Sequence, residues 1–360
     1  MKESFVCDVV IPIWNQLELT QRCLQSVLAS TSESIRFILI DNGSLPPTRD
    51  TLEQFRNASS VPVTLIRNET NLGFIKATNQ GIRASTADWI CLLNNDTVVT
   101  PGWLSEMLQV AQGDPHIGLV NPTSNSLGFH PGKTPLQEYA ARLQTFSGQS
   151  APLPKAMGFC LLASRSLLER VGGLDESFGM GNFDDDDLSF RVKKAGLRCV
   201  RACAAYVFHE EKASFRHLPG WKEAFQENRR QFEQRWGRSL RILWAPVTSG
   251  SAPEVAAAPF QFAAKLADQG HWVTFMNPSS VVPLEFSPHA QVNILKTDPH
   301  RWRLQATFRL LSKRKKPFDL VISYDADWSR CLHRLRWFHR AQILHAPTLA
   351  QILEQCQCQR

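Results

Sequence analysis

Apolar runs and segments with helical spacing alternate along residues 1–120 of the chain. Four runs, FVCDVVIPIW, IRFILID, VTLIRN and DWICLLNND, read as strands. Between them, LTQRCLQSVLAS, TRDTLEQFRNA and NLGFIKATNQGIRAS place apolar residues at the intervals of a helix. Strands that alternate with helices at this spacing predict right-handed βαβ units and a mostly parallel sheet.

The pattern returns later in the chain, after an irregular stretch. Residues 121–149 are rich in Asn, Ser, Gly and Pro, and the loop they contain is too long for a simple connector. A structured block follows at residues 157–208, and the amphipathic WKEAFQENRRQFEQRWG ends in glycine. Near residues 240–251 the order of strand, loop, helix and strand begins again. We therefore expect two α/β domains, residues 1–244 and residues 245–360.

Composition narrows the class of protein. With 360 residues, 43% of them hydrophobic, the chain can bury one large core or two modest ones. Its nine cysteines are an odd number without a CxxC pair, which favours reduced thiols in a cytosolic protein. The N-terminus lacks a secretory pattern, and no apolar run is long enough to span a bilayer. We expect a cytoplasmic protein with at most peripheral contact at the inner face of the cell membrane.

The net charge of +7 is unevenly distributed along the chain. Residues 245–360 carry 14 Lys and Arg against 8 Asp and Glu, which leaves 26 against 25 in the preceding part. A first domain so close to neutrality argues against nucleic-acid binding. The cluster Lys313 to Lys316 is interpreted as a solvated loop or, less simply, as a contact to lipid phosphates.

Polar residues follow each predicted strand of the first domain, at the edge where parallel sheets bind ligands. They are Asn15, then Asp41, Asn42, Gly43 and Ser44, then Arg67 and Asn68, then Asn94, Asn95 and Asp96. Each group can be an ordinary turn, because Asn, Asp and Gly favour turns. Alternatively, Asp41 accepts hydrogen bonds from a base or ribose, and Asp96 binds a divalent cation.

The segment FDDDDLSFR places four consecutive aspartates, Asp184 to Asp187, before a helical pattern. Helix capping and the helix dipole account for one or two acidic residues, but not for four. Mutual repulsion should raise the pKa of some of them, which suits a proton acceptor in a cleft. His209, after the strand-like AAYVF, is either an ordinary surface or core histidine or a metal ligand.

Taken together, these segments resemble family 2 glycosyltransferases with the GT-A fold, particularly the rhamnosyltransferase-like members. The resemblance covers residues 5–240 and is carried by VVIPIWNQ, IDNGS, NLGFIKATNQGI, LLNNDT, GFCLLASR, GGLDESFG, DDDDLSFRVKKAG and VFHEEKASF, in that order. It implies a GT-A nucleotide-diphospho-sugar transferase fold, with a mixed, mostly parallel sheet flanked by helices. It also implies transfer of a sugar from a nucleotide-diphosphate donor to a hydroxyl of a glycan or lipid-linked glycan acceptor, in surface polysaccharide or other glycan synthesis.

The resemblance also implies roles for individual residues. Those that would border the nucleotide or substrate are Pro12, Asn15, Asp41, Asn42, Gly73, Asn79, Asn94, Asn95 and Asp184. Asp185 would be the general base, and Asp96 and His209 would bind a divalent metal, Mn or Mg. Asn94 departs from the family's acidic residue, and Asp184 replaces a glutamate. One base and no nucleophile imply a single displacement with inversion.

The second domain resembles, more faintly, the N-terminal Rossmann half of a family 4 GT-B glycosyltransferase. Only about the last 115 residues are available for it, so we expect a smaller Rossmann-like domain without independent catalysis. Two alternative functions for the chain stay open at this point. One is a nucleotidyltransferase-like enzyme, although no glycine-rich, basic phosphate-binding segment follows VVIPIW. The other is a non-catalytic module that binds sugar nucleotides. The loop within residues 121–149 is expected to carry acceptor selectivity.

Overall fold

The structure, a computed structural model, describes residues 5–210, 220–245, 257–277, 291–298, 300–312 and 317–358. The chain divides into two compact units. The first comprises Met1–Ala151 and Lys155–Arg230, and the second Pro152–Pro154 and Gln231–Arg360. The predicted boundary at residue 245 falls at the end of a strand that belongs to the second unit, so the division comes earlier in the chain.

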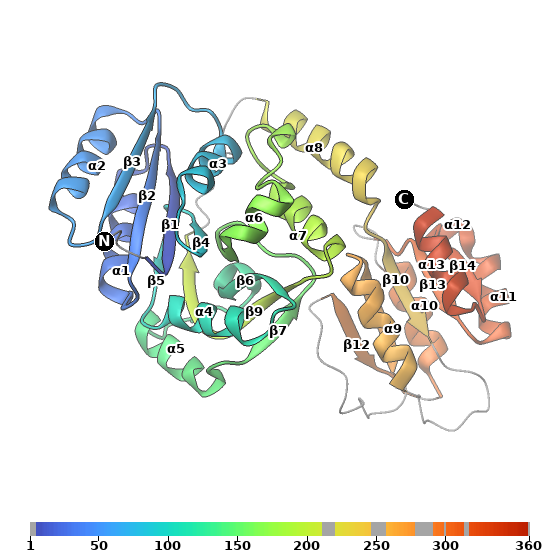
Figure 1. Ribbon diagram of the computed structural model, residues 1–360. Helices are drawn as coiled ribbons and strands as arrows, with labels where there is room; N and C mark the ends of the chain where they lie inside the picture. The colour runs from blue at the N-terminus through green and yellow to red at the C-terminus, as the bar shows by residue number, and fades with distance from the viewer. Residues whose placement is uncertain are drawn as a thin grey trace. The chain divides into compact units, whose positions relative to one another are not determined.

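The first unit is built on a nine-stranded sheet, which Figure 1 shows flanked by helices. Its strands are β1 (Cys7–Ile13), β2 (Ile35–Asn42), β3 (Val63–Asn68), β4 (Trp89–Leu93), β5 (Thr97–Val99), β6 (Ile117–Thr123), β7 (Ser150–Leu153), β8 (Cys160–Ser164) and β9 (Arg198–His209). They lie in the order β3-β2-β1-β4-β8-β6-β9-β5, and β7 pairs with β9.

The direction of pairing changes across this sheet. The four strands β3, β2, β1 and β4 are parallel, as the βαβ pattern predicts. β8 runs antiparallel to both β4 and β6, whereas β6 and β9 are parallel. The prediction of a mixed, mostly parallel sheet is therefore confirmed, and the carboxyl ends of β1, β2 and β4 share one edge.

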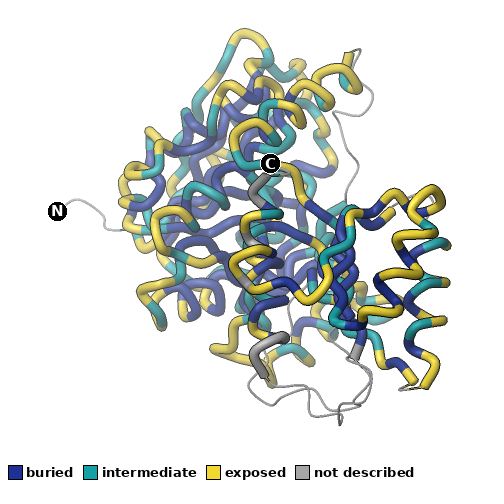
Figure 2. Tube along the Cα trace, turned by 90° about the vertical axis from the view of Figure 1, so that its right-hand side faces the viewer, coloured by how far each residue is buried: buried dark blue, intermediate teal, exposed yellow. Residues whose placement is uncertain are grey.

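Helices bury apolar stripes against this sheet. They are α1 (Leu17–Ser30), α2 (Pro46–Ala58), α3 (Phe74–Ala84), α4 (Trp103–Gly113), α5 (Leu136–Leu143), α6 (Arg165–Val171) and α7 (Asp184–Lys194), and a further helix, α8 (Trp221–Trp236), begins in the first unit and ends in the second. In α1, for example, Leu19, Cys23 and Val27 recur four residues apart and are buried. Figure 2 shows the result, with buried strands inside and exposed residues along the outer faces of the helices.

The second unit has a five-stranded sheet whose four pairs of neighbouring strands are all parallel. Its strands are β10 (Arg241–Ala245), β11 (Trp272–Asn277), β12 (Val292–Lys296), β13 (Leu320–Ser323) and β14 (Gln342–His345), in the order β12-β11-β10-β13-β14. Numbered within the unit, this order is 3-2-1-4-5, as in a doubly wound α/β sheet. This order is consistent with a Rossmann-like domain, which stays a prediction, as does the likeness to a family 4 enzyme.

Helices cover both faces of the second sheet. They are α9 (Ala257–Asp268), α10 (Trp302–Ser312), α11 (Ala326–Arg334), α12 (Arg336–His339) and α13 (Leu349–Cys358). Because successive strand residues alternate between faces, Trp244 packs in the core with α9 and α13, whereas Leu243 packs with α10 and α11.

The expectations about membrane-spanning segments and cysteines can be compared with the described part of the chain. Within it, every helix is too short or too polar to cross a bilayer. Six cysteines are buried: Cys7, Cys23, Cys91, Cys160, Cys199 and Cys356. The cluster Lys313 to Lys316 lies outside the described residues.

Candidate functional site

The carboxyl ends of β1 and β2 are joined by side chains that the sequence analysis singled out. Pro12 is buried in β1 opposite Ile40 of β2, one residue before the strand ends. Asn15, after β1, has a positive φ of 58° and accepts a hydrogen bond from the Leu45 backbone N–H at 2.8 Å through Oδ1. Its own N–H donates to Ser44 Oγ at 2.9 Å. Asn15 therefore fixes the loop after β2.

Asp41, the penultimate residue of β2, is almost completely buried. Its Oδ1 accepts a hydrogen bond from the Ser44 N–H at 2.9 Å, which holds the start of the loop after β2. Arg67 Nη2 of β3 lies 2.7 Å from Oδ2, but this pair lacks hydrogen-bond geometry. Among the described residues, Oδ2 thus has a neighbouring charge and no hydrogen-bond donor.

Asn42 holds the loop between β3 and α3. Its Nδ2 donates to Asn71 Oδ1 at 2.8 Å, and its Oδ1 accepts hydrogen bonds from Asn68 Nδ2 at 2.9 Å and Leu72 N–H at 3.0 Å. Gly73 caps α3 with a φ of +89°, a conformation that favours glycine. Both amide ends of Asn42 are thus engaged within the protein.

A Cβ on Gly73 would lie 3.1–3.3 Å from atoms of Met180 and Gly179. The Phe74 N–H donates to the Met180 carbonyl at 3.4 Å. These contacts bring the start of α3 against the loop that leads to α7, so a side chain larger than hydrogen at position 73 would force this loop to shift.

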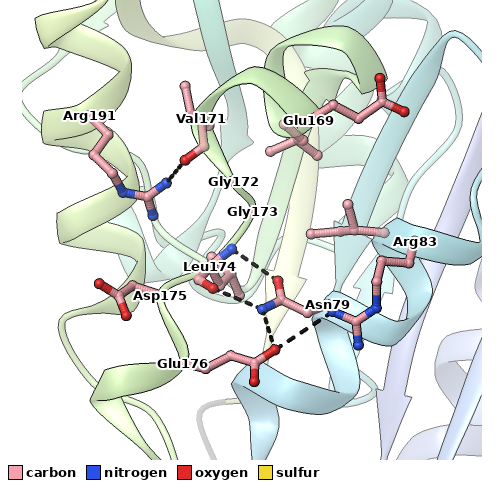
Figure 3. A pocket seen from close by; sticks show the side chains of 12 residues that line it. Asn79, Arg83, Glu169, Val171, Gly172, Gly173, Leu174, Asp175, Glu176 and Arg191 are labelled. Carbon is pink, nitrogen blue, oxygen red and sulfur yellow. Dashed lines mark hydrogen bonds and ion pairs between the residues drawn. The ribbon is translucent and has the colours of Figure 1, made fainter.

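The structure places Asn79 away from these strand ends. Its Nδ2 donates to the Leu174 carbonyl at 2.8 Å and Glu176 Oε1 at 3.0 Å, and its Oδ1 accepts from the Leu174 N–H at 3.0 Å. It faces a cavity of about 660 Å³ between α3, α6 and α7, with Arg83 and Arg191 on its walls (Figure 3). The hydrogen bonds of Asn79 hold the GGLDES loop, which precedes the aspartate run.

The aspartate run opens onto a second cavity, of about 450 Å³. Asp184, Asp185 and Asp186, in the first turn of α7, line it together with His209 and Asn94. Further lining side chains are Phe74, Met157, Phe159, Phe183 and Phe225. Polar groups from α7, β9 and the end of β4 thus converge in one hollow with aromatic walls, and we call it the acidic cavity.

Backbone conformation determines which aspartates face the acidic cavity. Asn182 and Phe183 both have positive φ, 76° and 69°, so the chain turns sharply into α7. Asn228 of α8, itself buried, donates to the carbonyls of Phe178 and Gly181 at 2.7 and 2.8 Å. These hydrogen bonds fix the segment that ends at the aspartate run.

Asp185 is oriented by two backbone donors. Its Oδ2 accepts from the Gly158 N–H at 3.0 Å, and its Oδ1 accepts from the Asp186 N–H at 2.9 Å. Burial, followed by repulsion from the Asp186 carboxylate, raises the pKa of Asp185 to about 6. Burial, followed by repulsion from Asp185, raises the pKa of Asp184 to about 8. Near neutral pH, Asp184 is therefore largely protonated, and Asp185 is largely a carboxylate able to accept a proton.

The other two aspartates have cationic partners. Asp186 pairs with Lys155, and the fully buried Asp187 accepts a hydrogen bond from Arg191 Nε at 2.7 Å. Arg191 also donates to the Val171 carbonyl at 2.5 Å, which ties α7 to the end of α6. No pattern in the sequence indicates Lys155, because 31 residues separate it from Asp186.

Asp96 and His209, predicted as metal ligands, lie side by side. β5 and β9 pair antiparallel, and Asp96 Oδ1 is 3.1 Å from His209 Nε2. The other ring nitrogen, Nδ1, shares a hydrogen bond of 2.9 Å with Ser126 Oγ. The imidazole stacks on Phe159 with ring centroids 5.1 Å apart. These contacts hold Nε2 toward Asp96.

These donors fit a hard divalent cation. The separation of 3.1 Å is close to that between two neighbouring ligands, each about 2.1 Å from a metal. Among the described residues no group of three His, Cys, Asp or Glu side chains placed to hold a metal occurs. Asn94 Oδ1 is buried without a described hydrogen-bond donor and belongs to a residue of the same cavity. Asn95 instead donates to Thr20 Oγ1 at 2.9 Å.

Part of the chain is similar to known proteins. Residues 8–172 match the sequence model of the family described as glycosyl transferase family 2. Over 228 residues the chain is 28% identical to the N-acetylglucosaminyl-diphospho-decaprenol L-rhamnosyltransferase of Mycobacterium tuberculosis, covering 54% of this chain and 72% of that protein. It is also 28% identical over 262 residues to the uncharacterized protein y4gI of Sinorhizobium fredii, covering 66% of this chain and 28% of the relative.

A solved structure shares the fold. The mannosyltransferase PcManGT from Pyrobaculum calidifontis, in complex with GDP-Man and Mn²⁺, matches with a TM-score of 0.50 and 18% identity. The match covers 65% of this chain and 64% of that one, and at this identity it shows the fold alone. The chain spans less than half the length of several curated relatives that it matches.

Proposed function

Because this chain belongs to glycosyl transferase family 2 through residues 8–172, we propose that it transfers a sugar from a nucleotide-diphosphate donor to an acceptor hydroxyl. The observation that carries the proposal is the acidic cavity. A half-buried carboxylate of raised pKa, Asp185, lines the same hollow as His209, which lies beside Asp96. A proton acceptor in the same cavity as a potential cation site suits sugar transfer from a diphosphate.

Asp185 is assigned as the general base. Its two oxygens accept hydrogen bonds from the Gly158 and Asp186 N–H groups, so its direction is fixed before a substrate binds. A pKa of about 6 leaves most of it ionised at pH 7, yet basic enough to receive a hydroxyl proton as the hydroxyl attacks. In this scheme no carboxylate of the protein acts as a nucleophile. The reaction is therefore a single displacement with inversion.

Asp96 and His209 are assigned to a divalent cation, Mn²⁺ or Mg²⁺. When bound, such a cation neutralises charge on the departing diphosphate. The contribution of the chain is to hold the two ligands: Ser126 fixes Nδ1 of the imidazole, and Phe159 fixes the plane of its ring. Asn94 Oδ1 is a further oxygen available in the same cavity.

The nucleotide is assigned to the ends of β1 and β2. Asp41 Oδ2 has no described hydrogen-bond donor, so it can accept one from a base. Asn15 and Asn42 support this role indirectly, because their hydrogen bonds hold the two loops on either side of Asp41. The rhamnosyltransferase relative is named for a lipid-diphosphate acceptor. A glycan or lipid-linked glycan, in polysaccharide synthesis, is accordingly the proposed acceptor class.

The acceptor is proposed to meet the loop within residues 121–149. Asn125 exchanges two hydrogen bonds with the His209 backbone, at 2.7 and 2.8 Å. Tyr206 OH donates to the Phe129 carbonyl at 3.2 Å. The loop is thus fixed to the end of β9, beside the acidic cavity, where an acceptor hydroxyl has to enter.

The test is a screen of nucleotide-diphosphate sugars for release of nucleoside diphosphate by the full chain, with Mn²⁺ added or removed by chelation. We expect one donor class to be cleaved only with metal. Metal-independent binding without release from any donor would support the binding-module alternative, and release of pyrophosphate from a nucleoside triphosphate would support the nucleotidyltransferase.

With the donor known, Asp185→Asn should lower the turnover number by about 10²–10⁴-fold. Donor affinity should change little, because the amide keeps an acceptor for the Gly158 N–H. Asp50→Asn, on an exposed part of α2, is the matched control and should retain full turnover. Unchanged turnover in Asp185→Asn would refute the assignment of the base.

A further inference from the structure

A small cavity in the second unit is lined by two arginines and by no acidic residue among those described. It has a volume of about 200 Å³ and lies at the amino ends of β10, β11 and β12. Arg241, Trp272, Thr274, Asn293 and Arg309 contribute to its wall. A doubly wound sheet binds its usual ligands at the carboxyl ends of the strands, so this cavity lies at the opposite edge.

The register of the sheet puts the first four of these residues on one face. Arg241 of β10 is paired with Trp272 of β11, and Thr274 is paired with Asn293 of β12. Residues that are paired, or two apart in one strand, point to the same side. Helix α10 covers this face, since its Ala306 and Leu310 pack with Leu243 and Met276 in one core. Arg309 of α10 therefore lines the side of the cavity that faces the sheet.

Neither guanidinium group forms an ion pair with an acidic side chain among the described residues. The Nε atoms of Arg241 and Arg309 are buried and have no hydrogen-bond acceptor among the described residues. By contrast, Arg238, Arg303 and Arg330 of the same unit each pair with an aspartate. The Arg241 guanidinium lies over the Trp272 ring, 6.0 Å from its centroid, which limits its rotation. Two partly buried positive charges beside one hollow, without a counter-charge, are costly unless an anion joins them.

We propose that this cavity is a binding site for the phosphoryl group of a small ligand: inorganic phosphate, diphosphate or a small phosphate ester. Arginine donates paired N–H groups that match phosphate oxygens, and Thr274 and Asn293 add neutral hydrogen-bonding groups. The volume sets the size of the ligand. Since a water takes about 30 Å³ and drug-sized ligands occupy about 300–1,000 Å³, 200 Å³ holds a phosphate with a small attached group and excludes a nucleotide sugar.

The site is independent of the acidic cavity and of the proposed glycosyl transfer. All of its residues belong to the second unit, and the aspartates of α7 belong to the first. Its ligand therefore need not be the sugar donor, and binding can be measured without any transfer assay.

The experiment is isothermal titration of the full chain with inorganic phosphate, pyrophosphate and glucose 1-phosphate, with glucose and acetate as the uncharged and carboxylate comparisons. We expect saturable binding of at least one phosphate compound and none of glucose or acetate. Arg241→Gln and Arg309→Gln should each weaken it by about tenfold or more, since each removes a charged hydrogen bond. The matched control is Arg330→Gln, at an exposed arginine of the same unit, and it should bind as the wild type does.

Folding of the variants is checked by thermal unfolding without phosphate. Losing an unpaired charge should leave the Tm unchanged or higher. If a glutamine variant unfolds early, Arg241→Lys and Arg309→Lys carry the test, because lysine keeps the charge and loses the paired donors. Binding of phosphate that is undiminished in the double variant would place it elsewhere in the chain and overturn the proposal. So would the absence of saturable binding, or acetate binding as tight as that of phosphate.

Discussion

Replacing Asp184 by asparagine should stabilise the protein, and the gain should grow with pH. Asp184 is buried at the start of α7, and burial, followed by repulsion from Asp185, raises its pKa from 3.8 to about 8. Between these two pH values the folded state holds a proton that the unfolded chain releases. The contribution of Asp184 to the stability of the wild type is therefore largest below pH 3.8 and falls as pH rises toward 8. Asparagine is neutral throughout and escapes this loss.

The size of the effect follows from the proton difference. One proton held by the folded state costs about 1.4 kcal/mol per pH unit, or about 2.7 kcal/mol between pH 5 and pH 7. Asp185 titrates in the same interval, so part of this change belongs to the pair. We expect the advantage of Asp184→Asn to widen by about 1–3 kcal/mol over this interval, which corresponds to roughly 2–4 °C in Tm per kcal/mol.

Calorimetric unfolding of the full chain at pH 5, 6, 7 and 8 measures this directly. The quantity to follow is the difference in Tm between the variant and the wild type at each pH. Asp50→Asn, at an exposed aspartate, is the control and should show a constant difference. A difference for Asp184→Asn that is also constant, or that shrinks as pH rises, would refute the raised pKa and with it our view of the acidic cavity.

Two other substitutions test the surroundings of this cavity. Lys155→Met should move the midpoint of the kcat/KM–pH profile up from about pH 6, by as much as about one unit, because the Lys155 charge lowers the pKa of Asp185. Lys265→Met, at an exposed lysine of the second unit, should leave this midpoint in place. A downward shift in Lys155→Met would contradict the assignment. Asn79→Ala should lower the free energy of unfolding by about 2–4 kcal/mol, since it leaves the Leu174 N–H and carbonyl without their partner. Urea unfolding measures that loss against the exposed Asn57→Ala, and equal values for the two variants would count against it.

The parallel half of the first sheet could be predicted from the sequence, but the antiparallel half could not. Alternating strands and helices up to β4 imply crossovers, and crossovers imply parallel neighbours. β8 has an apolar pattern of the same kind, yet it inserts antiparallel between β4 and β6. Burial on both faces gives a parallel and an antiparallel strand the same apolar pattern. Only the contacts between distant segments distinguish them.

The candidate site was predictable in its residues and less so in their roles. Asp96 and His209, 113 positions apart, do meet, as family resemblance implied and residue spacing alone could not. The interpretation of Asn15, Asn42 and Asn79 as direct substrate contacts stays a prediction, since their described hydrogen bonds all lie within the protein. An amide at a strand end has the same sequence signal whether it binds a ligand or a loop.

The aspartate run shows the same limit. From the sequence, only Asp184 and Asp185 were given roles in the site. In the structure Asp186 also lines the cavity, paired with Lys155, and only Asp187 is turned away, toward Arg191. The two positive-φ residues before the helix set this rotation, and composition gave no sign of them.

The hydrogen bonds of Asn228 determine where the chain can be cut. The family model ends at residue 172, and β9 ends at His209, so either position looks like a natural limit for a minimal enzyme. A fragment that stops there loses Phe225 from the cavity wall and the Asn228 donors to Phe178 and Gly181. Those carbonyls belong to the segment that leads into α7 and determines which of Asp184 to Asp187 face the acidic cavity. A truncated chain therefore has to retain α8 to Trp236. Shorter fragments should lack the proposed activity even though the full chain has it.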